Sequence, residues 1–305
     1  MDNEFANEEL GKYIKNIQPE TGYDGPYVSD NNYRDLNDLL CSYTFEFRRN
    51  KWEKYEYQGI NVPRVTSIIN DTINKEYLNG WAAKLGDQYH KTMDMILDTG
   101  TLAHLMIEDF INKGRISGIY DGVDNADQLK ASRAYHNFVN FWNDLKKNGY
   151  IITPIVTEME FATPWYGGTI DFIASITSPE GITRNYILDF KTSSKISFQY
   201  FLQTMAYKQA CEYLRYTQEL EPGTNPISNF KVPEINGIGI IRVDKESNKY
   251  EFIIADDQVD TKFLADTSNC VASMVNWYYR KQYMEDIYKD FRTKYIKEGG
   301  LYGIY

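Results

Sequence analysis

Cysteine is scarce in this chain of 305 residues, which contains only Cys41, Cys211 and Cys270. An odd number of cysteines so far apart is not a disulfide framework, and the sequence has no C-x-x-C pair that would bind zinc. Three cysteines are also too few for the four-cysteine ligand set of an iron–sulfur cluster. We therefore expect no iron–sulfur cluster, and the scattered cysteines are typical of a reducing, intracellular compartment.

Long apolar runs are also missing. No stretch approaches the roughly 18 consecutive apolar residues that a membrane helix needs. The first 30 residues are acidic and polar, without the basic and apolar regions of a signal peptide. The sequence thus predicts a chain that does not interact with membranes, while 42% apolar and 25% charged residues are ordinary for a globular protein.

Positive charge is in the minority, with 33 Lys and Arg against 43 Asp and Glu and a formal net charge of -10. This balance argues against a protein that coats nucleic acid through many phosphate contacts. It leaves room for an enzyme with a local basic groove, because bound metal ions supply positive charge at the site itself. With only three histidines, any metal site must be dominated by carboxylates, which favours Mg²⁺ or Mn²⁺.

The hydrophobic periodicity changes from helical to strand-like after about residue 147 and then alternates. Within 1–60 we expect a polar leader and a hairpin of 43–47 with 55–57. Helices are expected between 65 and 114 and at 127–147, followed by strands at 151–163, 168–177 and 185–192. The last expected elements are a helix at 197–216, strands at 235–243 and 250–254, and a helix at 256–291. This order predicts an α/β or α+β fold with one central mixed sheet flanked by helices. We expect an N-terminal elaboration over 1–60 and one domain over 61–305, with its core at about 98–255.

The pattern Asp-x-Lys is weak on its own, since about one chance occurrence is expected in this length, and the chain has three. The pairs at 144/146 and 260/262 lie in helical patterns, where residues two apart diverge, so we expect solvated surface pairs. Asp189 and Lys191 end an apolar, strand-like run. On a strand, residues two apart point to the same face, so this pair is the candidate for chemistry.

Asp171 lies in a similar apolar run, within Ile170 to Ile173. If the two runs are adjacent antiparallel strands, Asp171 and Asp189 lie side by side, and two carboxylates that close repel each other unless a proton or cation lies between them. A hard divalent cation would resolve this repulsion. Lys191 could then orient or deprotonate a water, or stabilise developing negative charge. The alternative is an ordinary ion pair at a strand end.

Two further pairs have the spacing of a helix face. Gln203 and Tyr207 are four residues apart in the helix expected after Lys191, and His104 and Glu108 are four apart in an earlier helix. A helix packed on the sheet could bring the His104 imidazole to the metal. The alternative is a histidine that merely packs in the core or on the surface.

Taken in order, these motifs resemble the RecB-like exonuclease branch of the PD-(D/E)XK nuclease superfamily. This branch includes phage-type members and mitochondrial genome maintenance exonucleases. The branch pattern is G-T-x-x-H-x-x-x-E on a helix, G-x-x-D on a strand, an apolar run into D-x-K-T, and Q-x-x-x-Y on a helix. The matching segments are Gly100 to Glu108, Gly168 to Asp171, Leu188 to Thr192, and Gln203 to Tyr207. Val62 to Ser67 and Trp81 to Ala83 also resemble the helices that precede this pattern in phage-type members and in mitochondrial genome maintenance exonucleases. The resemblance covers about residues 61–255 and implies a restriction-endonuclease-like core with an N-terminal helical elaboration.

The resemblance also implies roles for single residues. They are the metal ligands His104, Asp171, Asp189 and the backbone carbonyl of Phe190, the catalytic Lys191, and the supporting catalytic pair Gln203 and Tyr207. Glu108 or Glu160 would be a further ligand, although a solvated strand glutamate explains Glu160 equally well. The implied cofactor is Mg²⁺, for which Mn²⁺ would substitute.

The implied activity is metal-dependent hydrolysis of DNA phosphodiester bonds from a DNA end, in replication, recombination or repair and alongside the proteins of those processes. The alternatives are a structure-specific endonuclease on the same core and an inactive nucleic-acid-binding module. No Walker A motif is present, so we expect a stand-alone nuclease. The Asn-, Ile-, Lys- and Tyr-rich composition suits a phage or an AT-rich bacterium, and hence the cytoplasm of a bacterial or phage-infected cell.

Basic and aromatic residues before His104 are candidates for guiding a DNA end into the site. The first candidates are Arg48, Arg49, Arg64, Lys84 and Trp81. The same channel would also be lined by Lys51, Lys54, Lys75, Trp52, Tyr55 and Tyr57. Basic groups would follow the backbone, and aromatic rings would stack on unpaired bases. The alternative is that the N-terminal hairpin simply packs on the core.

Overall fold

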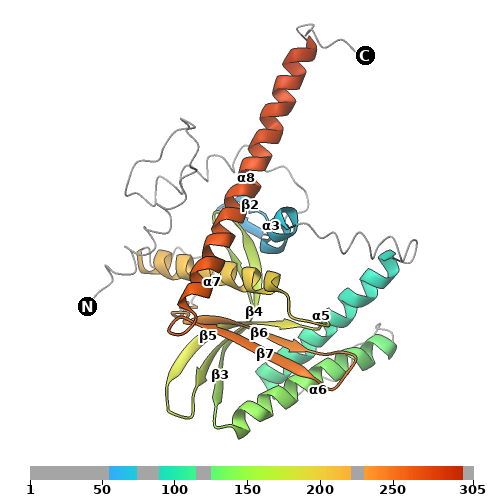
Figure 1. Cartoon of the computed structure of the whole chain (residues 1–305), viewed down its shortest axis with the longest axis vertical. Coiled ribbons are helices and arrows are strands. Elements are labelled where there is room, and N and C mark those ends of the chain that lie inside the picture. The colour runs from blue at the N-terminus through green and yellow to red at the C-terminus, as the bar shows by residue number, and fades with distance from the viewer. Residues whose placement is uncertain (1–54, 74–88, 115–124, 221–229, 298–305) are drawn as a thin grey trace.

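The computed structural model describes residues 55–73, 89–114, 125–220 and 230–297 (Figure 1). The helices are α3 (Val65–Thr72), α5 (Tyr89–Lys113), α6 (Asn125–Lys147), α7 (Phe198–Leu220) and α8 (Thr261–Lys297). The strands are β1 (Tyr55–Tyr57), β2 (Ile60–Val62), β3 (Ile151–Ala162), β4 (Gly167–Thr177), β5 (Thr183–Lys191), β6 (Gly237–Val243) and β7 (Tyr250–Asp256). None of the described helices is long and apolar enough to cross a membrane.

The centre of the fold is a five-stranded mixed sheet with the order β3-β4-β5-β6-β7. Neighbouring strands are antiparallel except β5 and β6, which are parallel. A parallel pair needs a crossover connection, and α7 lies in the chain between these two strands. The sequence-based prediction of one mixed sheet flanked by helices is thus confirmed.

Helices cover both faces of this sheet, so that it is the middle of three layers (Figure 1). One apolar core lies between the sheet and α3, α7 and α8. A second core lies between the sheet and α5 and α6. Because both faces are covered, β5 and β6 consist largely of buried residues, as expected for strands with helices on either side.

Tyr55 and Tyr57 form a strand as expected, but in the described part of the chain that strand pairs with the segment that follows it. Strand β1 pairs with β2, so Ile60 to Val62 is a strand rather than the lead into a helix. Gln58 and Gly59 have positive φ, 48° and 81°, and two such residues suit a tight hairpin turn. The expected partner segment, 43–47, lies outside the described residues.

This hairpin of β1 and β2 packs on the core. The Tyr57 hydroxyl lies 2.8 Å from the Tyr213 hydroxyl on α7, and the Tyr55 hydroxyl lies 2.9 Å from Thr169 Oγ1 on β4. The hairpin also spans residue 60, the expected border between the N-terminal elaboration and the domain.

Two helical expectations need correction. The apolar spacing of the helix expected at 127–147 predicts Leu129 on its buried face, but in α6 this residue is 62% exposed. The last helix begins at Thr261 rather than at 256, since the carbonyl of Asp260 accepts the first helical bond, from Leu264 N–H. Strand β7 therefore extends to Asp256.

Asp260 and Lys262 test the prediction that this Asp-x-Lys pair is a solvated surface pair. Lys262 contacts Asp266 at 2.8 Å, and both side chains are well exposed, whereas the Asp260 carboxylate accepts the Asp256 N–H at the start of α8. We expect Lys262→Ala to change the free energy of unfolding by less than about 0.5 kcal/mol. Asp260→Ala should lower it by about 1 kcal/mol, because it removes the hydrogen bond that the carboxylate accepts from the Asp256 N–H. Urea denaturation measures both values, and a larger loss for Lys262→Ala would contradict the assignment.

Candidate metal and catalytic site

Asp171 and Asp189 lie on adjacent antiparallel strands, β4 and β5. Phe172 pairs with Leu188, and the same register continued by one residue places Asp171 opposite Asp189. At this point the Asp171 side chain takes part in the strand pairing, because its Oδ2 accepts the backbone N–H of Phe190 at 2.9 Å. The two carboxylates that the sequence predicted to be neighbours are therefore brought together at the end of β5.

The Asp189 carboxylate is fully buried. Its residue is 0% exposed, and its Oδ2 contacts the Lys191 ammonium group, whereas its Oδ1 has no hydrogen-bond partner among the described residues. Burial, together with the charge of the neighbouring Asp171, raises the pKa of Asp189 to about 7 against the opposing charge of Lys191. Such a carboxylate is costly to bury, and it gains most from a bound cation.

Lys191 occupies the last position of β5, where it contacts Asp189 and lies over the Tyr200 ring, 5.2 Å from its centroid. Burial by itself lowers the pKa of this ammonium group, but the charges of Asp189 and Asp171 outweigh that effect and raise it. Lys191 is therefore protonated at neutral pH, which suits stabilisation of negative charge better than abstraction of a proton.

His104 reaches the same site from α5. Its Nε2 lies 3.0 Å from the backbone carbonyl of Phe190, and its Nδ1 lies 3.7 Å from Asp171 Oδ2. Burial, together with the charge of Lys191, lowers the pKa of His104 to about 4. The imidazole is therefore neutral at neutral pH, and the neutral ring is the form that binds a metal.

Glu158 is a candidate ligand that the sequence reasoning missed. One ligand atom from each of His104, Glu158 and Asp171 lies within 4.8 Å of the other two. Within the described residues this group includes neither the expected ligand Asp189 nor the expected additional ligands Glu108 and Glu160.

The backbone of β3 explains this difference. Glu158 has a φ of 48°, which is unusual for a strand residue. The regular alternation that would place the side chains of Glu158 and Glu160 on the same face of the sheet is therefore broken at Glu158. It lies between the paired residues Thr157 and Met159, whose partners on β4 flank Asp171. The residue opposite Asp171 could be found once the strand register was known, but the positive φ has no signal in the sequence.

These donors fit a hard divalent cation. Carboxylate oxygens, a backbone carbonyl and a neutral imidazole are brought together from β3, β4, β5 and α5, and a set dominated by oxygen suits Mg²⁺ or Mn²⁺. The burial of the Asp189 carboxylate, whose Oδ1 has no hydrogen bond from the described residues, is the structural observation behind this fit, since a cation would compensate that burial.

Gln203 and Tyr207 share one face of α7, as expected. Gln203 Nε2 donates a hydrogen bond of 2.7 Å to the Tyr207 hydroxyl. Tyr207 is buried, and burial together with the charges of Asp189 and Asp171 raises its pKa well above the usual value. The phenol therefore stays protonated. The Phe161 ring packs edge-to-face against the Tyr207 ring, with 5.5 Å between the ring centroids.

The two motif glycines differ in the space around them. A Cβ added at Gly168 would lie 2.8 Å from the Tyr207 ring and 3.0 Å from the Phe161 ring, whereas one at Gly100 would meet only Thr192 Oγ1, at 3.6 Å. We expect Gly168→Ala to lower the free energy of unfolding by about 2–3 kcal/mol, because the core is overpacked. Gly100→Ala should be neutral or should stabilise α5 by about 1 kcal/mol. Chemical denaturation of the two variants measures both, and equal values would contradict this packing.

Of the basic residues expected to contact DNA, Arg64 can be placed. It is exposed immediately before α3, beside Gly167 at the start of β4. The candidates at 48, 49, 51, 52, 54, 75, 81 and 84 lie outside the described residues. No protein-family model matches the chain, and no curated protein matches it at a significant level.

Proposed function

We propose that this protein is a divalent-metal-dependent DNA nuclease that acts from a DNA end, as an exonuclease. The observation that carries the proposal is the fully buried Asp189 carboxylate, which lies beside Asp171 and contacts Lys191, and whose Oδ1 has no hydrogen bond from the described residues. The resemblance of the motifs to RecB-like nucleases also supports a metal-dependent DNA nuclease. A role in replication, recombination or repair, within the cytoplasm, belongs to the proposal.

The residues that would hold Mg²⁺ are His104, Glu158, Asp171, Asp189 and the carbonyl of Phe190. When bound, the ion supplies positive charge at a phosphate and makes a bound water more acidic. The neutral His104 is already in the form that binds a metal, whereas burial raises the pKa of Asp171 and Asp189, so metal binding would displace a proton from these carboxyl groups.

The other side chains act on the substrate. Lys191 holds a positive charge next to the carboxylates, where it would stabilise the negative charge that develops on the phosphate. Tyr207, which receives a hydrogen bond from Gln203, keeps its proton and would orient a phosphate oxygen or water. Because Lys191 is held by Asp189 and Tyr207 by Gln203, they need little rearrangement when substrate binds.

An inactive binding module is the less favoured alternative. Burial of the Asp189 carboxylate is unfavourable for stability, as its raised pKa indicates, and a chain released from catalysis would have no physical reason to keep it beside Asp171. A structure-specific endonuclease on the same core would use the same site residues. It differs from an exonuclease because it does not need a DNA end, so the choice of DNA substrate distinguishes the two enzymes.

The test is digestion of end-labelled single- and double-stranded oligonucleotides with Mg²⁺ or with EDTA. We expect cleavage that requires Mg²⁺ and leaves covalently closed circular DNA intact. Cleavage of closed circles would replace the exonuclease with an endonuclease, and no cleavage of any DNA with Mg²⁺ or Mn²⁺ would overturn the nuclease proposal.

A further inference from the structure

A buried arginine lies beside the catalytic lysine. Lys191 pairs in register with Arg242 on the parallel strand β6. Residues that pair in this way lie next to each other on one face of the sheet, so Arg242 is at the same end of the sheet as the proposed site. Arg242 is only 3% exposed. A charge this well buried is tolerated only when it is paired and hydrogen-bonded.

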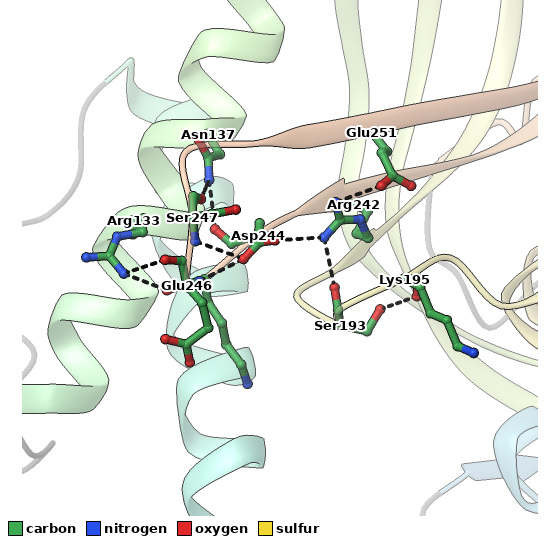
Figure 2. A network of polar contacts seen from close by, with 10 residues as sticks. Arg133, Asn137, Ser193, Lys195, Arg242, Asp244, Glu246, Ser247 and Glu251 are labelled. Atoms are coloured by element: carbon green, nitrogen blue, oxygen red, sulfur yellow. Dashed lines mark hydrogen bonds and ion pairs between the residues drawn. The ribbon is translucent and has the colours of Figure 1, made fainter.

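The partners of Arg242 connect two different parts of the chain. Its Nη1 donates to the backbone carbonyl of Ser193 and to Asp244 Oδ2, each at 3.2 Å, and its Nη2 donates to Glu251 Oε1 at 2.8 Å (Figure 2). Ser193 follows Lys191 by two residues and lies in the segment that leads to α7. Arg242 therefore links the chain that leaves the catalytic strand to the hairpin of β6 and β7.

The hairpin turn at one end of this link is itself held firmly. The Asp244 carboxylate accepts the N–H groups of Glu246 and Ser247, at 2.8 and 3.0 Å. Asn137 on α6, which is buried, donates through its Nδ2 to the carbonyls of Asp244 and Ser247 at 2.7 and 2.8 Å (Figure 2). Arg133, one turn earlier on α6, donates to the carbonyl of Glu246 at 3.1 Å.

The segment at the other end has few bonds of its own. Residues 192–197 form no helix or strand, and the Ser193 hydroxyl donates to the carbonyl of Lys195 at 2.9 Å. This segment joins Lys191 to the helix that carries Gln203 and Tyr207. Its position therefore affects groups of the proposed site on both sides of it.

We propose that Arg242 is a positioning residue of the cleavage site, which acts by holding the Ser193 carbonyl and so the backbone between Lys191 and α7. The inference rests on the proposed nuclease function for its catalytic consequence. It needs no contact between Arg242 and DNA or metal, and Arg242 has a fixed donor geometry that lysine cannot reproduce.

The experiment compares Arg242→Lys and Arg242→Gln with Glu251→Gln in the full chain. Glu251→Gln changes the exposed end of the same network and leaves the Ser193 contact in place. We expect Arg242→Lys to lower kcat about tenfold or more with the KM for DNA within about threefold, and Glu251→Gln to change kcat less than about twofold. Amide hydrogen exchange of 192–197 should rise in both Arg242 variants while exchange in α6 is unchanged.

The exchange measurement separates this inference from the proposed function. If the wild-type protein cleaves no DNA but exchange of 192–197 rises in the Arg242 variants, the nuclease proposal fails and the positioning role stands. The inference is overturned if exchange in this segment is unchanged, or if kcat falls equally in Arg242→Lys and Glu251→Gln in step with their melting temperatures. Loss of cooperative unfolding in both Arg242 variants would assign this residue to stability alone, which also overturns it.

Discussion

Replacing Asp189 or Lys191 with alanine should abolish DNA cleavage, but for different reasons. Asp189→Ala removes carboxylate oxygens that a hard cation needs, so we expect Mn²⁺ affinity to fall about tenfold or more and cleavage about a thousandfold or more, as expected when a metal site is disabled. Lys191→Ala removes only a positive charge beside Asp189. Cleavage should fall about a hundredfold or more, as after loss of a group that stabilises the transition state, while Mn²⁺ binding is kept or strengthened.

Calorimetric titration with Mn²⁺, together with single-turnover cleavage, separates the two effects. Lys262→Ala is the matched control, since it is also a lysine two residues from an aspartate but lies exposed on α8. Equal loss of Mn²⁺ binding in both site variants would contradict the role given to Lys191. A large loss of cleavage in Lys262→Ala would mean that the wrong Asp-x-Lys pair had been chosen.

Glu158→Gln should weaken Mn²⁺ binding about tenfold, because a ligand atom of Glu158 lies within 4.8 Å of those of His104 and Asp171 and an amide is a poorer ligand for a hard cation than a carboxylate. Glu160→Gln is the control on the same strand, and its Mn²⁺ affinity should stay within about twofold of the wild type. The side chain keeps its size in both variants, so neither should disturb packing.

The same calorimetric titration decides between these two glutamates. Loss of Mn²⁺ affinity in Glu160→Gln, with Glu158→Gln unchanged, would restore the ligand first suggested by the sequence. It would also mean that the positive φ of Glu158 does not serve metal binding.

The order and limits of the central strands were predictable because each has a clear hydrophobic signal. β6 and the middle of β5 are buried on both faces, and each has an apolar run in the sequence. The hairpin of β1 and β2 was not predictable in the same way. Its strands have three residues each, too few for a period, and its turn depends on a positive φ at Gln58.

The candidate site was predictable as far as it follows from strand geometry. Asp171, Asp189 and Lys191 could be brought together because strand residues two apart share a face and the two apolar runs could pair. Glu158 and Arg242 could not be identified, because one depends on an irregular backbone and the other on a network between distant segments. Interactions that depend on tertiary register have no local pattern.

The most direct test of the central claim is digestion of a linear DNA duplex by wild-type protein, Asp189→Asn and Lys262→Ala, side by side, with Mg²⁺. Asparagine keeps the shape of the buried side chain but removes its charge. We predict that the wild type and Lys262→Ala release nucleotides at equal rates and that Asp189→Asn releases none. Digestion by Asp189→Asn at the wild-type rate would contradict the assignment of this site as the metal-dependent nuclease centre.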